Sequence, residues 1–552
     1  MKRGALRAVR LAMAGVAVMT VLGGLASAGA VLFSSSAGAA VTGSAYFPLS
    51  SPERIADTRA NSGLALEGQT LGPDGTDIVP IPTGNAAGQV PTTATAVVLN
   101  VTAVNATQQS YFTVYPTNDP SAIQAGGQNA NFSDLNFFPG TTQPNLVTTP
   151  VANPSGTQLE VSVFNHSGSA DLVVDLEGYF APPSGTTGEF FPLTPARITD
   201  TRTGSNQPNA GQTLGQSSTL QVQVTGAGGV PSSNVSAVEL NVTATDTTAG
   251  SFFTAYPTGA TRPNTSNLNW NPGVTVANRV IVPLGTGGTI DIYNYAGNAD
   301  AVVDVDGYFT TSGYSATATQ GSYFNAVTPA RVSDTRTGSG EPEQGSPLGS
   351  QTSETVQIAG AATVPAVTSS TPPTAAVVNV TEATATAGSY LTVYPANVAL
   401  PLASDVNFVA GDVIANSDMV ALSPGGALGI YNWDGTTNVA VDVFGYYTPV
   451  QTDVVSVTPG TLTPGQNASQ TITIGVTQNS NAVVGDPVTV TVSATSGTCA
   501  SFPGGSNTAT GTTDGGGQVL IAYTTASAAG TCKFTATESQ TDQSNTGTIT
   551  VS

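Results

Sequence analysis

Residues 237–244 read AVELNVTA, and every second side chain in this stretch is apolar. In an extended chain the apolar residues would share one face, while Glu239 and Asn241 would share the other. This alternation predicts a β-strand that buries one face. Turn signals such as NPG at 271–273 separate similar stretches along the chain. We therefore expect an all-β protein built from antiparallel β-sandwiches or barrels.

The same strand occurs three times, as AVVLNVTA from Ala96, as AVELNVTA from Ala237 and as AAVVNVTEA from Ala375. Each copy is preceded by an arginine-containing motif: PERIADTR, PARITDTR or PARVSDTR. Each copy ends with VVDLEGYF, VVDVDGYF or AVDVFGYY. Repeats of about 135 residues are long enough to be domains with their own cores.

Small, polar, turn-forming links such as APPSGTTG join the copies, which is typical of domain boundaries. We expect the copies to follow one another as beads on a string. The predicted segments are an export signal over 1–40, β repeats over 41–180, 188–310 and 321–448, and an immunoglobulin-like sandwich over 451–552.

The first forty residues have a basic start, an uncharged apolar stretch over 11–33 and small residues at the end. This arrangement predicts an export signal, so we expect the protein outside the cell or at its surface. The alternative is an uncleaved anchor, because an apolar stretch of this length can span a bilayer. Membrane contact is expected only in that case.

The chain is strongly acidic, with a formal net charge of −21. An acidic surface repels the phosphate backbone, so we expect no nucleic-acid partner. Outside the first ten residues only nine lysines and arginines remain, and six of them belong to the repeated arginine motif. Charges that only increase solubility would be scattered instead.

The repeated motif supplies two arginines and one aspartate, and the last strand of each copy supplies a second aspartate. The three sets are Arg54, Asp57, Arg59 and Asp175; Arg197, Asp200, Arg202 and Asp304; and Arg331, Asp334, Arg336 and Asp442. The second aspartates share a strand face with Val, Ala or Phe, so they need cationic partners. Arginine suits this role because its planar guanidinium binds a carboxylate at two points.

Two interpretations of these sets stay open. In the first, each set is an internal ion-pair network that ties the start of a repeat to its last strand. In the second, the arginines bind a ligand, such as a carboxylated or sulfated sugar or a peptide C-terminus.

Catalysis has little support. The chain has one histidine, so a repeated Ser–His–Asp set cannot be formed. Tyr295 and Trp433 stand where the first copy has His166, which indicates a position for a flat ring. Paired carboxylates for glycoside hydrolysis, for example Asp57 and Asp175, remain formally possible. We expect no enzyme activity, no metal site and no cofactor.

Two further repeated features have two interpretations each. NVT at Asn100, Asn241 and Asn379 has the form of an N-glycosylation acceptor, but a polar strand face explains it equally well. The aromatic residues in YFTVYP, FFTAYP and YLTVYP come in adjacent positions, so one of each pair is expected in the core. The other could stack on a sugar.

The last hundred residues have short alternating strands, and Cys499 and Cys532 are expected to form a disulfide in an exported protein. With Thr513, Asp514 and Gly517 in a TDxxG-type turn and AGT at 529–531, this segment resembles bacterial immunoglobulin-like domains of the invasin and intimin type. That resemblance implies a spacer or display role. The three repeats are similar to tandem repeats of secreted actinobacterial surface proteins, which implies a compartment but no activity.

These observations favour a non-catalytic, secreted or cell-surface protein for adhesion or display. The expected partner is cell-wall or environmental polysaccharide, or a surface protein. One alternative is a purely structural stalk or coat component, and a second is a secreted glycan hydrolase.

Overall fold

The computed structural model describes residues 43–551 except 85–88, 118–131, 184–187, 312–320, 370, 451–452, 459–460, 463–464, 479–480, 484, 499–500 and 539–543. The predicted export signal and Cys499 lie outside the described residues. Regular structure in the described part consists of β-strands and short 3-10 turns. The predicted all-β class is therefore confirmed. No helix in the described ranges has the length and apolar character needed to cross a bilayer.

The first repeat forms two antiparallel four-stranded sheets. One sheet has the order β1 (Ala45–Asp57), β8 (Asp171–Ala181), β3 (Ala96–Val104) and β6 (Gln143–Pro150). The other has the order β2 (Gly75–Ile81), β7 (Leu159–Asn165), β4 (Ser110–Pro116) and β5 (Leu135–Phe137). This is the strand order of a jelly roll, a sandwich of eight strands.

The other two repeats have the same topology. In the second, the sheets are β9 (Phe190–Asp200), β16 (Asp300–Thr310), β11 (Val235–Thr245) and β14 (Val276–Pro283), and β10 (Thr219–Gln223), β15 (Thr289–Asn294), β12 (Ser251–Pro257) and β13 (Leu268–Trp270). In the third, they are β17 (Ser322–Asp334), β24 (Asn438–Pro449), β19 (Ala375–Ala383) and β22 (Val413–Ala421), and β18 (Thr352–Gln357), β23 (Ala427–Asn432), β20 (Ser389–Pro395) and β21 (Val406–Phe408).

Each sandwich has its own core between its two sheets. In β11, Val238, Leu240 and Val242 lie in the core of the second repeat, as their alternation predicted. Because the sheets of each repeat are open and face one another, the repeats are sandwiches rather than barrels.

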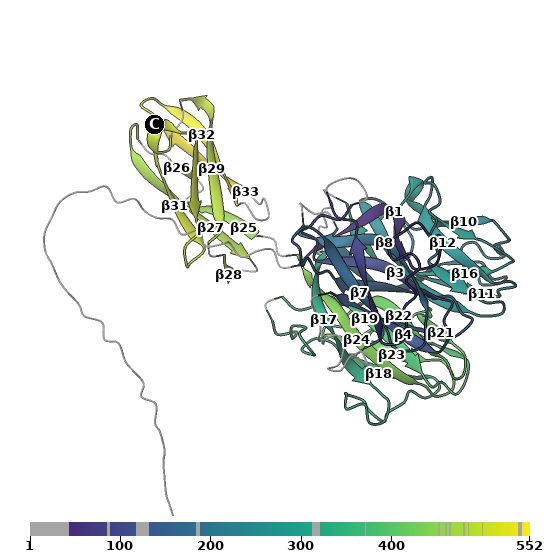
Figure 1. Ribbon diagram of the computed structural model, residues 1–552. Coiled ribbons are helices and arrows are strands. Elements are labelled where there is room, and N and C mark those ends of the chain that lie inside the picture. Colours follow the sequence, from purple (N-terminus) through teal and green to yellow (C-terminus); the bar gives the residue numbers. More distant parts are fainter. Residues whose placement is uncertain are drawn as a thin grey trace, which may run out of the picture.

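The outer faces of the β1, β9 and β17 sheets are also buried, because the three repeats pack against one another (Figure 1). Bridge pairing of Phe190 with Ser322 joins two of these sheets into one of eight strands. Strands β6, β14 and β22 contact one another at the centre of the assembly. The expectation of beads on a string was therefore wrong: the second face of each first sheet is covered by its neighbours.

Aromatic side chains from the first and last strands of each repeat form the shared core. Six of its rings, which meet between the repeats, are those of Tyr46, Phe180, Phe190, Phe309, Phe324 and Tyr447. Ring centroids of different repeats approach to 4.5 Å for Tyr46 and Phe309, 4.3 Å for Phe180 and Phe324, and 4.5 Å for Phe190 and Tyr447. Such contacts add stability beyond the area they bury.

The glycine in each closing motif makes room for these rings. A Cβ atom at Gly307 would collide with the ring of Phe190, and one at Gly445 would collide with the ring of Phe324. Side chains here would push the strand away from the shared core, so the glycine is a packing requirement.

The asparagines of the NVT stretches hold the repeats together in a closed ring. The side-chain amide of Asn100 donates to the carbonyl of Ser266 at 2.7 Å. In the same way Asn241 donates to Ser404 at 2.6 Å, and Asn379 to Ser133 at 2.7 Å. All three asparagines are buried, so the interpretation as a polar strand face is the one the structure supports.

The C-terminal segment is a two-sheet sandwich. One sheet contains β25 (Asp453–Thr458), β27 (Ser469–Gln478), β28 (Asn481–Ala482) and β31 (Gln518–Thr524). The other contains β26 (Thr461–Leu462), β33 (Ser544–Val551), β32 (Gly530–Glu538), β29 (Pro487–Gly497) and β30 (Thr508–Thr512). Cys532 is buried in β32. The disulfide stays a prediction because its other half lies outside the described part.

Candidate functional site

The structure brings the twelve arginines and aspartates together as three clusters, one in each repeat. The pairing of antiparallel strands β1 and β8 places Arg54 opposite Asp175. Arg54 Nε and Nη2 donate to the two carboxylate oxygens at 2.8 and 3.1 Å. Arg197 binds Asp304 at 2.9 and 3.0 Å, and Arg331 binds Asp442 at 3.0 and 2.8 Å. All three aspartates are fully buried.

The second arginine of each motif binds the first aspartate. Arg59 Nε and Nη2 donate to Asp57 at 2.9 and 2.5 Å, and the backbone N–H of Arg59 also donates to it. The pair Arg202–Asp200 repeats this arrangement in the second copy, and Arg336–Asp334 repeats it in the third. These arginines are about half exposed, so they reach the surface while the first arginines lie beneath them.

The two aspartates of a cluster differ in their titration. Burial alone would raise the pKa of Asp57, but the hydrogen bonds and charge of Arg59 outweigh it, so this pKa lies below its ordinary value. Burial raises the pKa of Asp175 despite its hydrogen bonds with Arg54. In the second repeat burial raises the pKa of Asp304 to about 6, against the opposing effect of Arg197.

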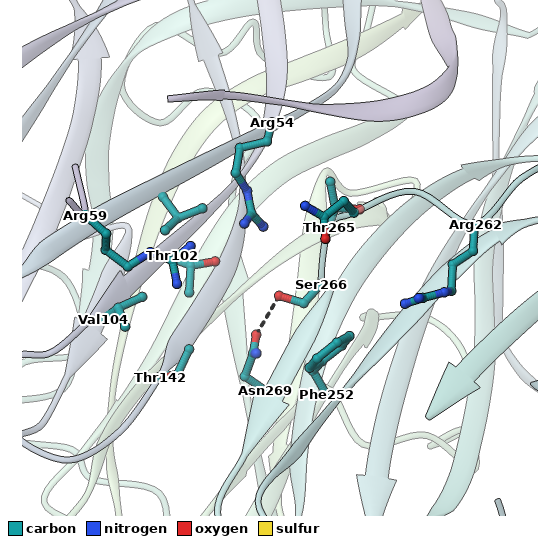
Figure 2. Close-up of a pocket in the computed structure, with 12 residues that line it drawn as sticks. Arg54, Arg59, Thr102, Val104, Thr142, Phe252, Arg262, Thr265, Ser266 and Asn269 are labelled. Carbon is teal, nitrogen blue, oxygen red and sulfur yellow. Dashed lines mark hydrogen bonds between the residues drawn. The ribbon is translucent and has the colours of Figure 1, made fainter. Parts of the chain in front are cut away.

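Each cluster borders a cavity at the junction with another repeat. The cavity beside Arg54 and Arg59 has a volume of about 270 Å³, and Phe252, Ser266 and Asn269 of the second repeat line its other side (Figure 2). The cavities beside the arginines of the second and third repeats have volumes of about 210 and 190 Å³. They are lined by the corresponding residues Tyr390, Ser404 and Asn407, and Tyr111, Ser133 and Asn136.

Each cavity also contains a threonine hydroxyl without a partner in the described part of the chain. Thr102, Thr243 and Thr381 follow the ring-forming asparagines by two residues and are 4%, 3% and 6% exposed. The Oγ1 atom of each makes no hydrogen bond. Because a buried hydroxyl gains from a hydrogen-bond partner, these three equivalent hydroxyls could bond to a molecule that enters the cavities.

One ring of a stacked pair lines each cavity: Phe252, Tyr390 or Tyr111. Tyr111 stacks on His166 with centroids 4.8 Å apart, Phe252 on Tyr295 at 4.9 Å, and Tyr390 on Trp433 at 5.8 Å. The prediction that the His166 position requires a flat ring is confirmed. Tyr295 and Trp433 are about half exposed, so their rings are accessible to solvent.

Of each adjacent pair in YFTVYP, FFTAYP and YLTVYP, the second residue is in the core, as expected. Phe112, Phe253 and Leu391 are fully buried inside the sandwiches. The first residue of each pair is the one that reaches the cavity. The first residue is therefore the one that could stack on a sugar.

An ion cluster around Arg279 was missed from the sequence. This arginine lies on β14, is fully buried, and forms ion pairs across the junction of the second and third repeats. Its partners are Glu239, Asp306, Asp405 and Asp418. Burial raises the pKa of all four carboxylates, although the charge of Arg279 opposes the shift. The signal in the sequence was a single arginine inside the apolar stretch VANRVIVP.

The residues the structure describes contain no group of three histidines, cysteines or carboxylates able to hold a metal ion. The lining of the three junction cavities consists of arginine, threonine, asparagine, serine and apolar side chains. Such a lining can donate hydrogen bonds and present an aromatic face.

No protein-family model matches the chain, and no curated protein matches it. Among solved structures, one from an archaeal virus, described as a triple jelly roll fold with turret assembly, has 8% identity and a TM-score of 0.15, and the match covers 74% of this chain and 91% of that one. Escherichia coli alpha-2-macroglobulin activated by porcine elastase has 11% identity and a TM-score of 0.13, with 92% of this chain and 44% of that one covered. At such TM-scores neither likeness carries an argument.

Proposed function

We propose that the chain is a non-catalytic, extracellular or cell-surface binding protein that holds polysaccharide at the three junctions between its repeats. The observation that carries this proposal is the threefold occurrence of one constellation. Each junction combines a small cavity, an unpartnered buried threonine hydroxyl and a stacked aromatic pair. Sugars have an apolar ring face that packs on aromatic rings and hydroxyls that need hydrogen-bond partners.

Three equivalent sites on repeats that pack together favour a repetitive ligand. Once one unit of a polymer is bound, the next units lie close to the other sites, so the overall affinity exceeds that of a single site. A purely structural stalk, the rival interpretation, does not require the same hydroxyl and aromatic ring to recur beside all three cavities. The C-terminal sandwich would act as a spacer that displays the three-repeat body.

The test is binding of the purified chain to a glycan array, followed by affinity electrophoresis with the polysaccharides found. The key variant combines His166→Ala, Tyr295→Ala and Trp433→Ala, which removes the outer ring of all three pairs. We expect this triple variant to lose binding and each single variant to lose part of it, because avidity depends on several sites. The matched control is Leu520→Ala, which removes an exposed apolar side chain (68% exposed) from the C-terminal sandwich.

The control should bind as the unaltered chain does. Failure of the unaltered chain to bind any glycan would refute the proposal and favour the structural stalk. Unchanged binding by the triple variant would refute the assignment of the site to these rings.

A further inference from the structure

Arg262 differs from the other arginines of the described part because it has no carboxylate partner. It is exposed and lies in the segment after β12, at the junction of the first and second repeats. Its guanidinium carbon is 3.9 Å from the centre of the Tyr293 ring, a cation–π contact that positions the charge without neutralising it. Its positive charge is therefore available to a ligand.

Arg262 lines the same cavity as Arg54 and Arg59, and Figure 2 shows the three side chains around one space. The charges of Arg54 and Arg59 are matched by Asp175 and Asp57. Arg262 then adds one uncompensated positive charge. No carboxylate is among the residues that line this cavity. The cavity is thus a locally cationic place on a chain whose net charge is −21.

Further donors are directed at this space. Arg54 Nη1 is 3.9 Å from Asp57 Oδ2, which is too far for a hydrogen bond with that carboxylate. The hydroxyl of Thr102, buried and without a partner, lies in the same lining. Phe252 presents an aromatic ring beside them. This combination offers an apolar face for a sugar ring and N–H groups for an oxyanion.

The corresponding cavity of the second repeat lacks this extra charge. Arg262 lies four residues before Ser266, and Leu400 lies four residues before Ser404 at the equivalent place. Leu402, which stands where the first junction has Asn264, lines that second cavity. The arginine pair is common to both cavities, so Arg262 is what makes their charges differ.

We infer that the cavity between the first and second repeats binds an acidic sugar unit, with Arg262 and Arg54 binding its carboxylate or sulfate ester and Phe252 packing on its ring. This inference rests on the proposed function and adds the ligand class. A volume of about 270 Å³ lies below the range of drug-sized pockets, which suits a single sugar unit. Long-range electrostatic attraction cannot supply the affinity for an acidic polymer, because the net negative charge of the chain repels polyanions.

The experiment measures binding of the full chain to polygalacturonate, dextran sulfate and neutral dextran by isothermal titration calorimetry. Polygalacturonate tests a carboxylate source and dextran sulfate tests a sulfate source. The variant Arg262→Leu converts the position to the residue found at Leu400, and Arg262 is exposed, so the melting temperature should not change. We expect the variant to bind the preferred acidic polymer about 10- to 100-fold more weakly, as for loss of a charge-assisted hydrogen bond.

The reciprocal variant Leu400→Arg tests whether a positive charge added at the second junction increases binding. It should strengthen binding of the acidic polymer at the second junction, also when combined with Arg262→Leu. Binding of dextran, which has no acidic group, should change much less than binding of the acidic polymer. If Arg262→Leu binds the acidic polymers as tightly as the unaltered chain, the inference is overturned, while loss of binding on removal of the aromatic rings would still support the proposed function.

If the unaltered chain binds none of the polymers and no glycan on the array, the proposed function fails. In that case, binding of the small probes D-galacturonate and inorganic sulfate to the full chain tests the anion site independently of the polymers. Binding that is lost in Arg262→Leu would support the site, and absence of binding to both probes would overturn it.

Discussion

Replacement of Arg197 by alanine tests whether the arginine clusters stabilise the fold. The Arg197 side chain is 8% exposed and its partner Asp304 is fully buried. The substitution removes two hydrogen bonds, of 2.9 and 3.0 Å, and leaves a buried carboxylate without its cation. Breaking a buried pair in this way costs about 3–5 kcal/mol of the free energy of unfolding. The pair in the first repeat is more exposed, with 19% for Arg54, so Arg54→Ala should cost less.

The assay is urea unfolding of the full chain at pH 8, followed by tryptophan fluorescence. Both tryptophans, Trp270 and Trp433, lie in the three-repeat body, so the signal reports that body and not the C-terminal sandwich. An isolated second repeat would be a poor host, because its outer sheet face is covered by the other repeats. The cost should be smaller at pH 5, where Asp304 can take up a proton and lose its charge.

Two control variants isolate the effect. Arg202→Ala removes the arginine that is 44% exposed, and loss of such a pair should cost about 1 kcal/mol or less. Arg197→Ala combined with Asp304→Ala removes the orphaned charge and should recover part of the loss. A free energy of unfolding for Arg197→Ala within about 1 kcal/mol of the unaltered chain at pH 8 would refute the reasoning.

The other predictions concern the shared core and the junctions. Asn241→Ala removes the hydrogen bond to the Ser404 carbonyl and the one accepted from the buried Asn416 amide, so it should lower the free energy of unfolding by about 1–3 kcal/mol. A urea midpoint equal to that of the unaltered chain would contradict this. The second repeat expressed alone over 188–310 should self-associate in size-exclusion chromatography, because it exposes the aromatic side chains that the other repeats normally cover. A stable monomer would instead favour repeats that are independent domains. The melting temperature should fall from pH 5 to pH 8. The four carboxylates around Arg279 have raised pKa values, so the folded chain binds more protons than the unfolded chain in this pH range. A rise in melting temperature would contradict the burial of these carboxylates.

Repetition made much of the fold and of the candidate site predictable. Period-two alternation located the strands, and three copies of one order of motifs located the repeats. The four-residue sets containing Arg54, Arg197 and Arg331 stood out because basic residues are scarce and these recur at fixed places. The flat-ring position of His166 was visible for the same reason, since Tyr295 and Trp433 replace it in the other copies.

The arrangement of the repeats was not predictable from local patterns. In LVVDLEGYF both faces of the strand carry apolar residues, which indicates burial on both sides, but nothing in the alternation says what covers the second face. Contacts such as that between Asn100 and Ser266 join residues 166 positions apart. Arg279 was not predictable in this way because it occurs in only one of the three copies.

Fusion of three jelly rolls in one polypeptide has a consequence for how their contacts can differ. A symmetric homotrimer would carry every substitution three times around its axis, so an arginine like Arg279 would meet two copies of itself at the centre. A single chain escapes this constraint: one junction contains the buried Arg279, and another has Arg262 in addition to its arginine pair. Each junction is thus free to acquire its own chemistry while the common scaffold stays the same.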